Sequence, residues 1–146
     1  MSKLHYDGLK LLLAYTRDDG SVYTYECHNQ YEGGLNEYGE ARASLPNGVY
    51  SNAWAETYEM AMKNGPSYGC GYIHTGDSRG RDIHGGGSSL EEPYADSQGW
   101  LCTYGCLRMQ NKDVVELSAM MLEDGATYPG GGIELTVENN ENAEEV

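Results

Sequence analysis

Glycine divides this sequence into short apolar runs, and that division limits the folds open to the chain. Twenty of the 146 residues are glycine, tyrosine occurs 13 times, and phenylalanine is absent. Short apolar runs that end at glycine-rich turns are typical of β-strands, whereas a helical bundle needs long periodic segments. A chain of this length can bury the core of one domain. We therefore expect a mainly β fold.

The expected strands follow the alternation of apolar and polar residues and the turn signals between them. The clearest turn, Asp18-Asp19-Gly20, has the chemistry of a β-hairpin. Leu45-Pro46-Asn47-Gly48 is a second turn, in which proline fixes φ. Strands are expected at residues 9–15, 21–27, 69–74, 81–84 and 133–137, and after the second turn.

Helical periodicity is clearest at residues 113–122, whose apolar side chains fall on one face. Asn111 or Asp113 is expected to cap the start of this helix. A shorter helix is expected at residues 56–63. The fold should therefore contain one principal helix.

The chain is strongly acidic. Its formal net charge of −14 argues against nucleic acid and against anionic membranes as partners. Residues 138–146 carry four glutamates and no basic residue, which predicts a disordered tail. Residues 1–137 are then the single folded domain.

The four cysteines, Cys27, Cys70, Cys102 and Cys106, are too few for a disulfide-rich scaffold. They form neither a CxxC pair nor the spacing of a zinc site. The first residues do not begin a signal peptide, and no apolar run is long enough to insert into a membrane. The protein is expected either to leave the cell by a non-classical route or to have lost a leader.

Two glycine-containing motifs carry the candidate chemistry. Ile83-His84-Gly85 places a histidine at a bend, and Gly105-Cys106 places a cysteine just before the principal helix. A free thiol is mostly protonated at neutral pH, so a neighbouring imidazolium is expected to favour the thiolate. Cys106 is therefore the candidate nucleophile and His84 its partner. The polar residues 88–98 between them should form a loop that lies over the site and moves.

The order of these motifs resembles the YkuD-type L,D-transpeptidase domain. The likeness rests on Ile83-His84-Gly85, then Thr103-Tyr104-Gly105-Cys106-Leu107-Arg108-Met109, and then Asn111-Lys112-Asp113 and a helix. Residues 45–50 are similar to the family's T-P-x-G-x-Y turn, and the resemblance covers most of residues 7–137. It implies a curved β-sandwich or barrel-like sheet with a helix packed after the cysteine.

The sequence departs from the family pattern in three places. Tyr104 stands where the family usually has a histidine, and Leu45 replaces the threonine of the turn. The export signal expected of a cell-wall enzyme is also missing. The change at Tyr104 bears on acceptor preference, and neither substitution removes Cys106 or His84.

The resemblance also implies roles around the cysteine. The Gly85 carbonyl would fix the tautomer of His84, and the N–H groups of Tyr104, Gly105 and Cys106 would face the oxyanion. Arg108 is placed to bind a substrate carboxylate or to brace the loop.

Three neighbours of the motif have more than one interpretation. Tyr72 and His74 are further candidates for substrate contacts, although a core aromatic and a strand-end histidine are simpler interpretations. A bridge from Cys102 to Cys106 would silence the nucleophile. The expected strand position of Cys102 favours an inert buried thiol instead.

By resemblance, Cys106 attacks the amide carbonyl of the third residue of a peptidoglycan stem peptide and expels D-alanine. The thioester then passes to an amine (transpeptidation) or to water (carboxypeptidation). The resemblance implies no metal and no organic cofactor. One alternative is a catalytically idle module that binds wall peptides, and a weaker one is a thiol redox or metal-binding domain built on Cys102 and Cys106.

The expected place of action is the periplasm or cell wall. The chain could serve as a delivered antibacterial effector, as a phage-borne wall enzyme or as a secreted housekeeping enzyme. A stem peptide is the expected partner in each case. An immunity or delivery protein is expected in addition for an effector.

Overall fold

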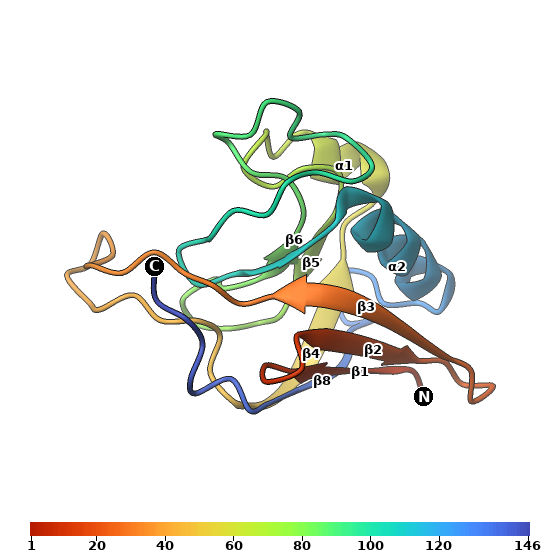
Figure 1. Cartoon of the computed structure of the whole chain (residues 1–146). Helices are drawn as coiled ribbons and strands as arrows, with labels where there is room; N and C mark the ends of the chain where they lie inside the picture. Colours follow the sequence, from red (N-terminus) through yellow and green to blue (C-terminus); the bar gives the residue numbers. More distant parts are fainter.

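Eight short strands close into a barrel in the computed structural model, which describes residues 1–146 (Figure 1). The elements in chain order are β1 (Lys3–Asp7), β2 (Leu12–Thr16), β3 (Val22–His28), β4 (Gly48–Ala55), α1 (Tyr58–Met62), β5 (Tyr72–His74), β6 (Ile83–His84), β7 (Leu107–Met109), α2 (Asn111–Glu123) and β8 (Ile133–Glu138). The mainly β prediction with one principal helix after the cysteine is confirmed.

The strands follow one another around the barrel in the order β1-β2-β3-β7-β6-β5-β4-β8. The pairs β1–β8 and β6–β7 are parallel, and the other pairs are antiparallel. The parallel pair β6–β7 joins the His84 motif to the Cys106 motif, with His84 opposite Arg108. Topology therefore places side by side two motifs that lie far apart in sequence.

The core fills the barrel with the inward side chains of the longer strands. Leu13 and Tyr15 of β2 and Leu135 of β8 are fully buried, and their neighbours in sequence are more exposed. Helix α2 packs against β4 and β5 through a buried apolar face that includes Val114 and Leu117. Each such side chain contributes about 1.5–3 kcal/mol to folding. Neither helix combines the length and the apolar character that crossing a membrane requires.

Two strands were not expected from the sequence. Strand β1 pairs with β2 and with β8 and so closes the barrel, and β7 carries the chain from Cys106 to α2. Strand β1 has only two buried positions among five residues, and β7 has only three residues, all buried. The three residues of β7 are too few to show the alternation that indicates a strand, whereas Lys3–Asp7 does alternate and was not recognised as a strand.

The start of α2 differs from the expected cap. Gln110 occupies the N-cap position without a side-chain hydrogen bond, and Asn111 is already helical. The Asn111 side chain is buried and binds other parts of the chain, as described below. The prediction that Asn111 or Asp113 caps this helix is therefore wrong.

The last nine residues make several hydrogen bonds to other parts of the chain, and the disorder predicted for 138–146 stays a prediction. Asn140 is buried, and its amide donates to the Ser44 hydroxyl (3.0 Å) and the Leu45 carbonyl (2.6 Å). The Val146 N–H donates to the Tyr31 carbonyl at 2.8 Å, so the C-terminus lies beside the loop between β3 and β4 (Figure 1). The predicted disorder rests on the acidic composition, whereas these hydrogen bonds are made by neutral amide groups.

Candidate active site

Cys106 sits at the end of a tight turn that leads directly into β7. The Thr103 hydroxyl accepts the Gly105 N–H (3.0 Å) and donates to the Cys106 carbonyl (2.7 Å). Gly105 has φ of +134°, and a Cβ there would lie 2.5 Å from the Ala43 carbonyl oxygen. Glycine is thus required on both conformational and steric grounds. The turn fixes where the half-buried Cys106 thiol points.

The thiol interacts with the backbone of the segment that leads into β6. The Asp82 N–H donates to Sγ at 3.3 Å, and Sγ lies 3.9 Å from the Gly80 carbonyl oxygen. Burial raises the pKa of Cys106 to about 11; the Asp82 N–H opposes this shift, and the Asp82 carboxylate adds to it. The protonated thiol is therefore the favoured form at neutral pH.

The His84 imidazole is buried and held in one tautomer. Its Nδ1 lies 2.8 Å from the Gly85 carbonyl oxygen, which also accepts from Arg108 Nη1 at 2.8 Å. A carbonyl can only accept, so Nδ1 carries the proton and Nε2 keeps its lone pair. Burial lowers the pKa of His84 to about 3, and the charge of Arg108 acts in the same direction.

These two shifts change the expected form of the pair. Cys106 and His84 both favour their neutral forms, so the resting site holds a thiol and an imidazole rather than a thiolate and an imidazolium. No hydrogen bond joins the two side chains in this structure, and Sγ interacts with Asp82 and Gly80 instead. His84 is consequently suited to accept the proton during attack rather than before it.

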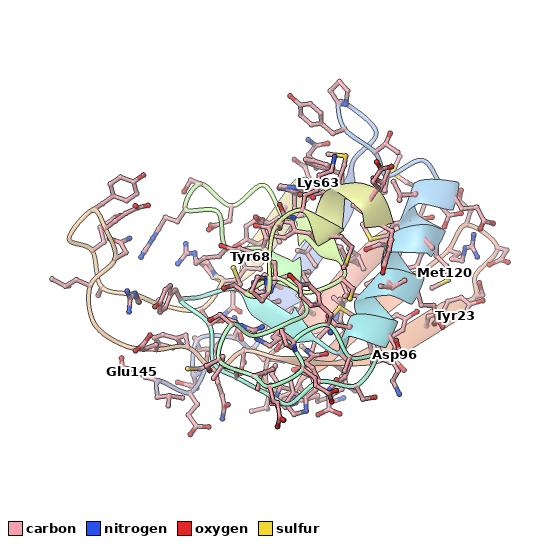
Figure 2. The ribbon with its side chains drawn as sticks, turned by 90° about the horizontal axis from the view of Figure 1, so that it is seen from above. Tyr23, Lys63, Tyr68, Asp96, Met120 and Glu145 are labelled. Atoms are coloured by element: carbon pink, nitrogen blue, oxygen red, sulfur yellow. The ribbon has the colours of Figure 1, made fainter.

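Two tyrosines hold the imidazole ring in place. Tyr68, labelled in Figure 2, meets His84 edge-on with ring centroids 4.9 Å apart. Tyr72 stacks nearly parallel to His84 at 5.8 Å. The ring is thus held by packing as well as by its Nδ1 hydrogen bond.

Arg108 is almost fully buried and braces the His84 bend. Its Nη1 donates to the carbonyl oxygens of Gly85 and Ser67, at 2.8 Å and 3.3 Å. Its Nε has no hydrogen-bond partner. A buried guanidinium with an unused N–H can accept an anionic group.

One pocket of about 390 Å³ brings these groups together. Cys106, His84 and Arg108 all line it, and Glu32 and Tyr104 contribute to its wall. The Arg42 guanidinium lies 3.9 Å from the centre of the Tyr104 ring, and its Nη1 lies 3.7 Å from the Glu32 carboxylate. The pocket is therefore lined by a guanidinium, a carboxylate and a thiol. No group of three or more acidic, histidine or cysteine side chains is arranged to hold a metal ion.

Asn111 ties the loops around the pocket to one another. Its Oδ1 accepts the N–H groups of Cys70 and Gly86, and its Nδ2 donates to the carbonyls of Pro93 and Ala95. A Cβ on Gly85 would collide with this Oδ1, so only glycine fits there. Both polar atoms of the Asn111 side-chain amide therefore have hydrogen-bond partners.

The loop at residues 88–98 meets the pocket at one end and is anchored at the other. Ser88 and Ser89 line the pocket, whereas Gln98 is buried and donates to the Met109 carbonyl at 2.7 Å. Asp96 lies beside the first turn of α2, where its carbonyl accepts the Lys112 N–H (Figure 2). That the loop moves stays a prediction.

Comparison with solved structures identifies the fold. The chain matches the helical cell shape determining protein Pgp2 of Campylobacter jejuni over 99% of its length and 50% of that chain, with a TM-score of 0.61 and 14% identity. It matches Bd1075 of Bdellovibrio bacteriovorus over 95% of its length and 48% of that chain (TM-score 0.56, 15% identity). It matches the L,D-transpeptidase (residues 123–326) of Xylanimonas cellulosilytica over 93% of its length and 59% of that chain (TM-score 0.51, 19% identity).

The chain has the YkuD-type fold. It spans between 48% and 59% of the length of these three structures, and it is at most 19% identical to any of them, so the likeness concerns the fold alone. No family model and no curated protein matches the sequence.

Within the YkuD-type fold, the motif residues predicted from the sequence occupy one site. Cys106, His84, Arg108 and Tyr104 share the pocket, and Gly85 binds the imidazole as expected. One of the three expected oxyanion donors, the Gly105 N–H, is already used, because it donates to the Thr103 hydroxyl. The N–H groups of Tyr104 and Cys106 have no partner and are free to face a ligand.

Tyr72 and His74 lie next to the site but do not line the pocket. The Tyr72 hydroxyl donates to the Asp82 carboxylate at 2.7 Å, and His74 Nε2 lies 2.7 Å from the Glu56 carboxylate. Cys102 lines the pocket, and both it and Cys106 are free thiols.

Sequence reasoning missed two polar residues of the site, Asp82 and Asn111. Asp82 precedes the Ile83-His84 motif, and Asn111 opens the segment after Met109 that the resemblance quotes, so adjacency to these motifs was the only available signal.

Proposed function

We propose that this protein is a cysteine acyltransferase that acts on peptidoglycan stem peptides, as an L,D-transpeptidase or an L,D-carboxypeptidase. The observation that carries the proposal is the shared pocket of Cys106 and His84, with the His84 Nδ1 proton held by Gly85 so that Nε2 is the basic nitrogen. The YkuD-type fold, found in the L,D-transpeptidase of Xylanimonas cellulosilytica, supports the assignment.

In the proposed reaction, Sγ of Cys106 forms a bond to the amide carbonyl carbon of the stem peptide while His84 Nε2 takes the thiol proton. The N–H groups of Tyr104 and Cys106 stabilise the oxyanion, an effect of roughly 3–4 kcal/mol per donor. When the C–N bond breaks, His84 returns the proton to the leaving nitrogen and D-alanine departs. An amine or water then cleaves the thioester.

Arg108 is proposed to bind a carboxylate of the substrate, because its guanidinium carries a positive charge and the residue lines the pocket. Tyr104 and Glu32 stand at the pocket wall, where an incoming amine acceptor would be discriminated. The place of action is proposed to be the periplasm or cell wall. A delivered effector, with an immunity protein as partner, remains one form of this proposal.

The decisive experiment incubates purified tetrapeptide muropeptides with the protein and analyses the products by mass spectrometry. Release of D-alanine with cross-linked products indicates transpeptidation, and release with tripeptides alone indicates carboxypeptidation. Cys106→Ala should abolish both products, because it removes the nucleophile. If Cys106→Ala still releases D-alanine, the assignment is wrong.

A catalytically idle module that binds wall peptides is the second candidate. The observations that favour it are the neutral resting pair and the interaction of Sγ with Asp82 and Gly80 rather than with His84. Binding of muropeptides with equal affinity by the wild type and Cys106→Ala, without any product, would select this candidate.

A further inference from the structure

One wall of the pocket comes from the loop between β3 and β4, which projects from the barrel in Figure 1. Glu32 belongs to this loop. Its backbone N–H donates to the Thr103 carbonyl at 2.7 Å, and the Thr103 N–H donates to the Gln30 carbonyl at 3.1 Å. Because Thr103 also fixes the turn that carries Cys106, these hydrogen bonds set the backbone of Glu32 beside that turn.

Glu32 supplies the one acidic side chain that lines the pocket. The side chain is 53% exposed, and the nearest cation to its carboxylate, Arg42 Nη1, lies 3.7 Å away, beyond hydrogen-bond distance. Arg108 is the one arginine or lysine of the lining, but it is almost fully buried and donates to backbone carbonyls. The exposed charge in the pocket is therefore the Glu32 carboxylate, which is complementary to a positively charged group of a ligand.

The ring of Tyr104 lies close to this carboxylate. The Cζ atom of Arg42 is 3.9 Å from the centre of the ring, and its Nη1 is 3.7 Å from the Glu32 carboxylate, so one cation contacts both groups. Arg42 does not line the pocket, and its Nη1 donates to the Gly33 carbonyl at 3.2 Å. Tyr104 is 66% exposed, which leaves much of its surface open to a ligand. An aromatic ring and a carboxylate that share a pocket are together suited to an ammonium ion.

We propose that Glu32 and Tyr104 form a subsite for an ammonium group of the ligand. The Glu32 carboxylate pairs with the ammonium group, and the open part of the Tyr104 ring covers the alkyl chain that carries it. The subsite lies beside the Cys106 turn, so the ammonium group belongs either to a side chain next to the attacked carbonyl or to the amine acceptor. The inference rests on the proposed function and adds to it the charge of the ligand, which an N-acylated analogue lacks.

The test measures how fast Cys106 reacts with three methanethiosulfonates that differ in charge: the cationic trimethylammonioethyl, the neutral methyl and the anionic sulfonatoethyl reagent. Each reagent transfers its alkylthio group to the Cys106 sulfur, which forms a mixed disulfide and releases methanesulfinate. The Cys102→Ala protein is used throughout, because Cys102 also lines the pocket. Dividing the cationic rate by the neutral rate cancels any change in how readily the thiol ionises.

Glu32→Gln keeps the backbone N–H and removes the charge, so the ratio of cationic to neutral rates should fall roughly three- to tenfold. Arg42→Gln removes the positive charge that competes for Glu32 and should raise the same ratio by roughly two- to threefold. The ratio of anionic to neutral rates should move the opposite way in each variant. Opposite signs separate charge from damage, since a loosened pocket admits all three reagents more readily.

Glu37→Gln is the matched control. Glu37 lies in the same loop and is exposed, but it does not line the pocket. Its replacement changes the net charge of −14 by the same amount as Glu32→Gln does, so it measures the contribution of the overall field. It should change each ratio by less than about 1.5-fold. Thermal unfolding of every variant checks that the fold is kept.

Muropeptide turnover tells which part of the ligand carries the ammonium group. If the donor peptide carries it, Glu32→Gln lowers kcat/KM for D-alanine release more strongly for a tetrapeptide with a free side-chain amine than for its N-acetylated form. If the acceptor carries it, the variant lowers the ratio of cross-linked to hydrolysed product.

The proposal is overturned if Glu32→Gln leaves the ratio of cationic to neutral rates unchanged, or if Glu37→Gln or Arg42→Gln lowers that ratio equally. The labelling reaction needs no peptidoglycan, so this result is separate from failure of the proposed function. A protein that shows the expected ratios but releases no D-alanine keeps the ammonium subsite and loses the enzymatic role.

Discussion

The barrel consists of two parts that are held together by different interactions. In the first, strands β1, β2, β3, β4 and β8 have five to eight residues each and bury apolar side chains such as Leu13 and Leu135. In the second, strands β5, β6 and β7 have two or three residues each, and polar groups such as His84 and Arg108 are buried among them. We call these the patterned part and the site part.

The difference follows from what each part has to do. The free energy of apolar burial is non-directional and roughly proportional to the buried area. It therefore stabilises the fold without setting the position of any particular atom. The hydrogen bonds of Asn111, Thr103 and Asp82 are directional, and they place the Cys106 turn and the His84 bend relative to each other. The patterned part therefore supplies stability, and the site part supplies geometry.

The largest effect is expected from truncating the patterned part. Leu135 is fully buried in β8, and Leu135→Ala should lower the free energy of unfolding by about 2–5 kcal/mol, because it leaves a cavity in the core. Urea denaturation measures this change. The pH profile of Cys106 alkylation in the folded variant should match the wild type. A shifted alkylation profile would show that packing in the patterned part also affects the reactivity of Cys106.

The second-largest effect on stability is expected from a substitution in the site part. Asn111→Ala leaves four buried backbone groups without partners and should cost about 2–4 kcal/mol of unfolding free energy. Unlike the Leu135 variant, it should also alter Cys106 alkylation, because Asn111 holds Gly86 next to His84. Lys112→Ala, an exposed change on the same helical turn, is the control and should alter neither quantity.

The comparison also bears on what the sequence could predict. The alternation in β2, β3 and β8 and the periodicity of α2 indicated their elements, because each is long enough to show a pattern. The cysteine and histidine motifs identified the pocket, since Cys106, His84 and Arg108 do share it. These predictions depend on local signals only.

What the sequence did not predict depends on tertiary contacts. The roles of Asp82 and Asn111 follow from partners between 7 and 41 residues away, which no spacing rule encodes. The neutral form of the Cys106–His84 pair follows from burial that becomes visible only in the folded barrel. The hydrogen bonds of the Asn140 side chain to the loop before β4 are also tertiary contacts that the sequence did not indicate.

A third prediction uses pH to separate the parts. Burial lowers the pKa of His84 to about 3, so between about pH 6.5 and pH 3 the unfolded state binds a proton that the folded state does not. Stability should therefore fall as the pH falls below about 6.5, by up to about 1.4 kcal/mol per unit from this group. Above that pH the contribution is constant.

The measurement compares unfolding free energies of the wild type and His84→Gln between pH 7 and pH 5. This range lies above the region in which the carboxyls of Asp77 and Asp124, with lowered pKa values, begin to titrate. The difference between the two proteins isolates His84. Equal slopes would contradict burial of a neutral imidazole.

The smallest effect is expected from replacing Cys102. This substitution is compared with the replacement of Cys27 in the patterned part. Cys27 is fully buried in β3, so Cys27→Ala should cost about 1 kcal/mol of unfolding free energy and leave turnover unchanged. Cys102 lines the pocket, but it makes no hydrogen bond to the turn and is assigned no chemical step. Cys102→Ala should change turnover by no more than about twofold.

Tetrapeptide turnover by Cys102→Ala, measured beside Cys106→Ala, tests this contrast. The variant should also keep its stability, because the neighbouring Thr103 rather than Cys102 fixes the turn through bonds of 3.0 Å and 2.7 Å. If Cys102→Ala loses turnover while Cys106→Ala keeps it, the nucleophile is Cys102. The turn of Thr103 and Gly105 would then place Cys106 only as part of the pocket wall.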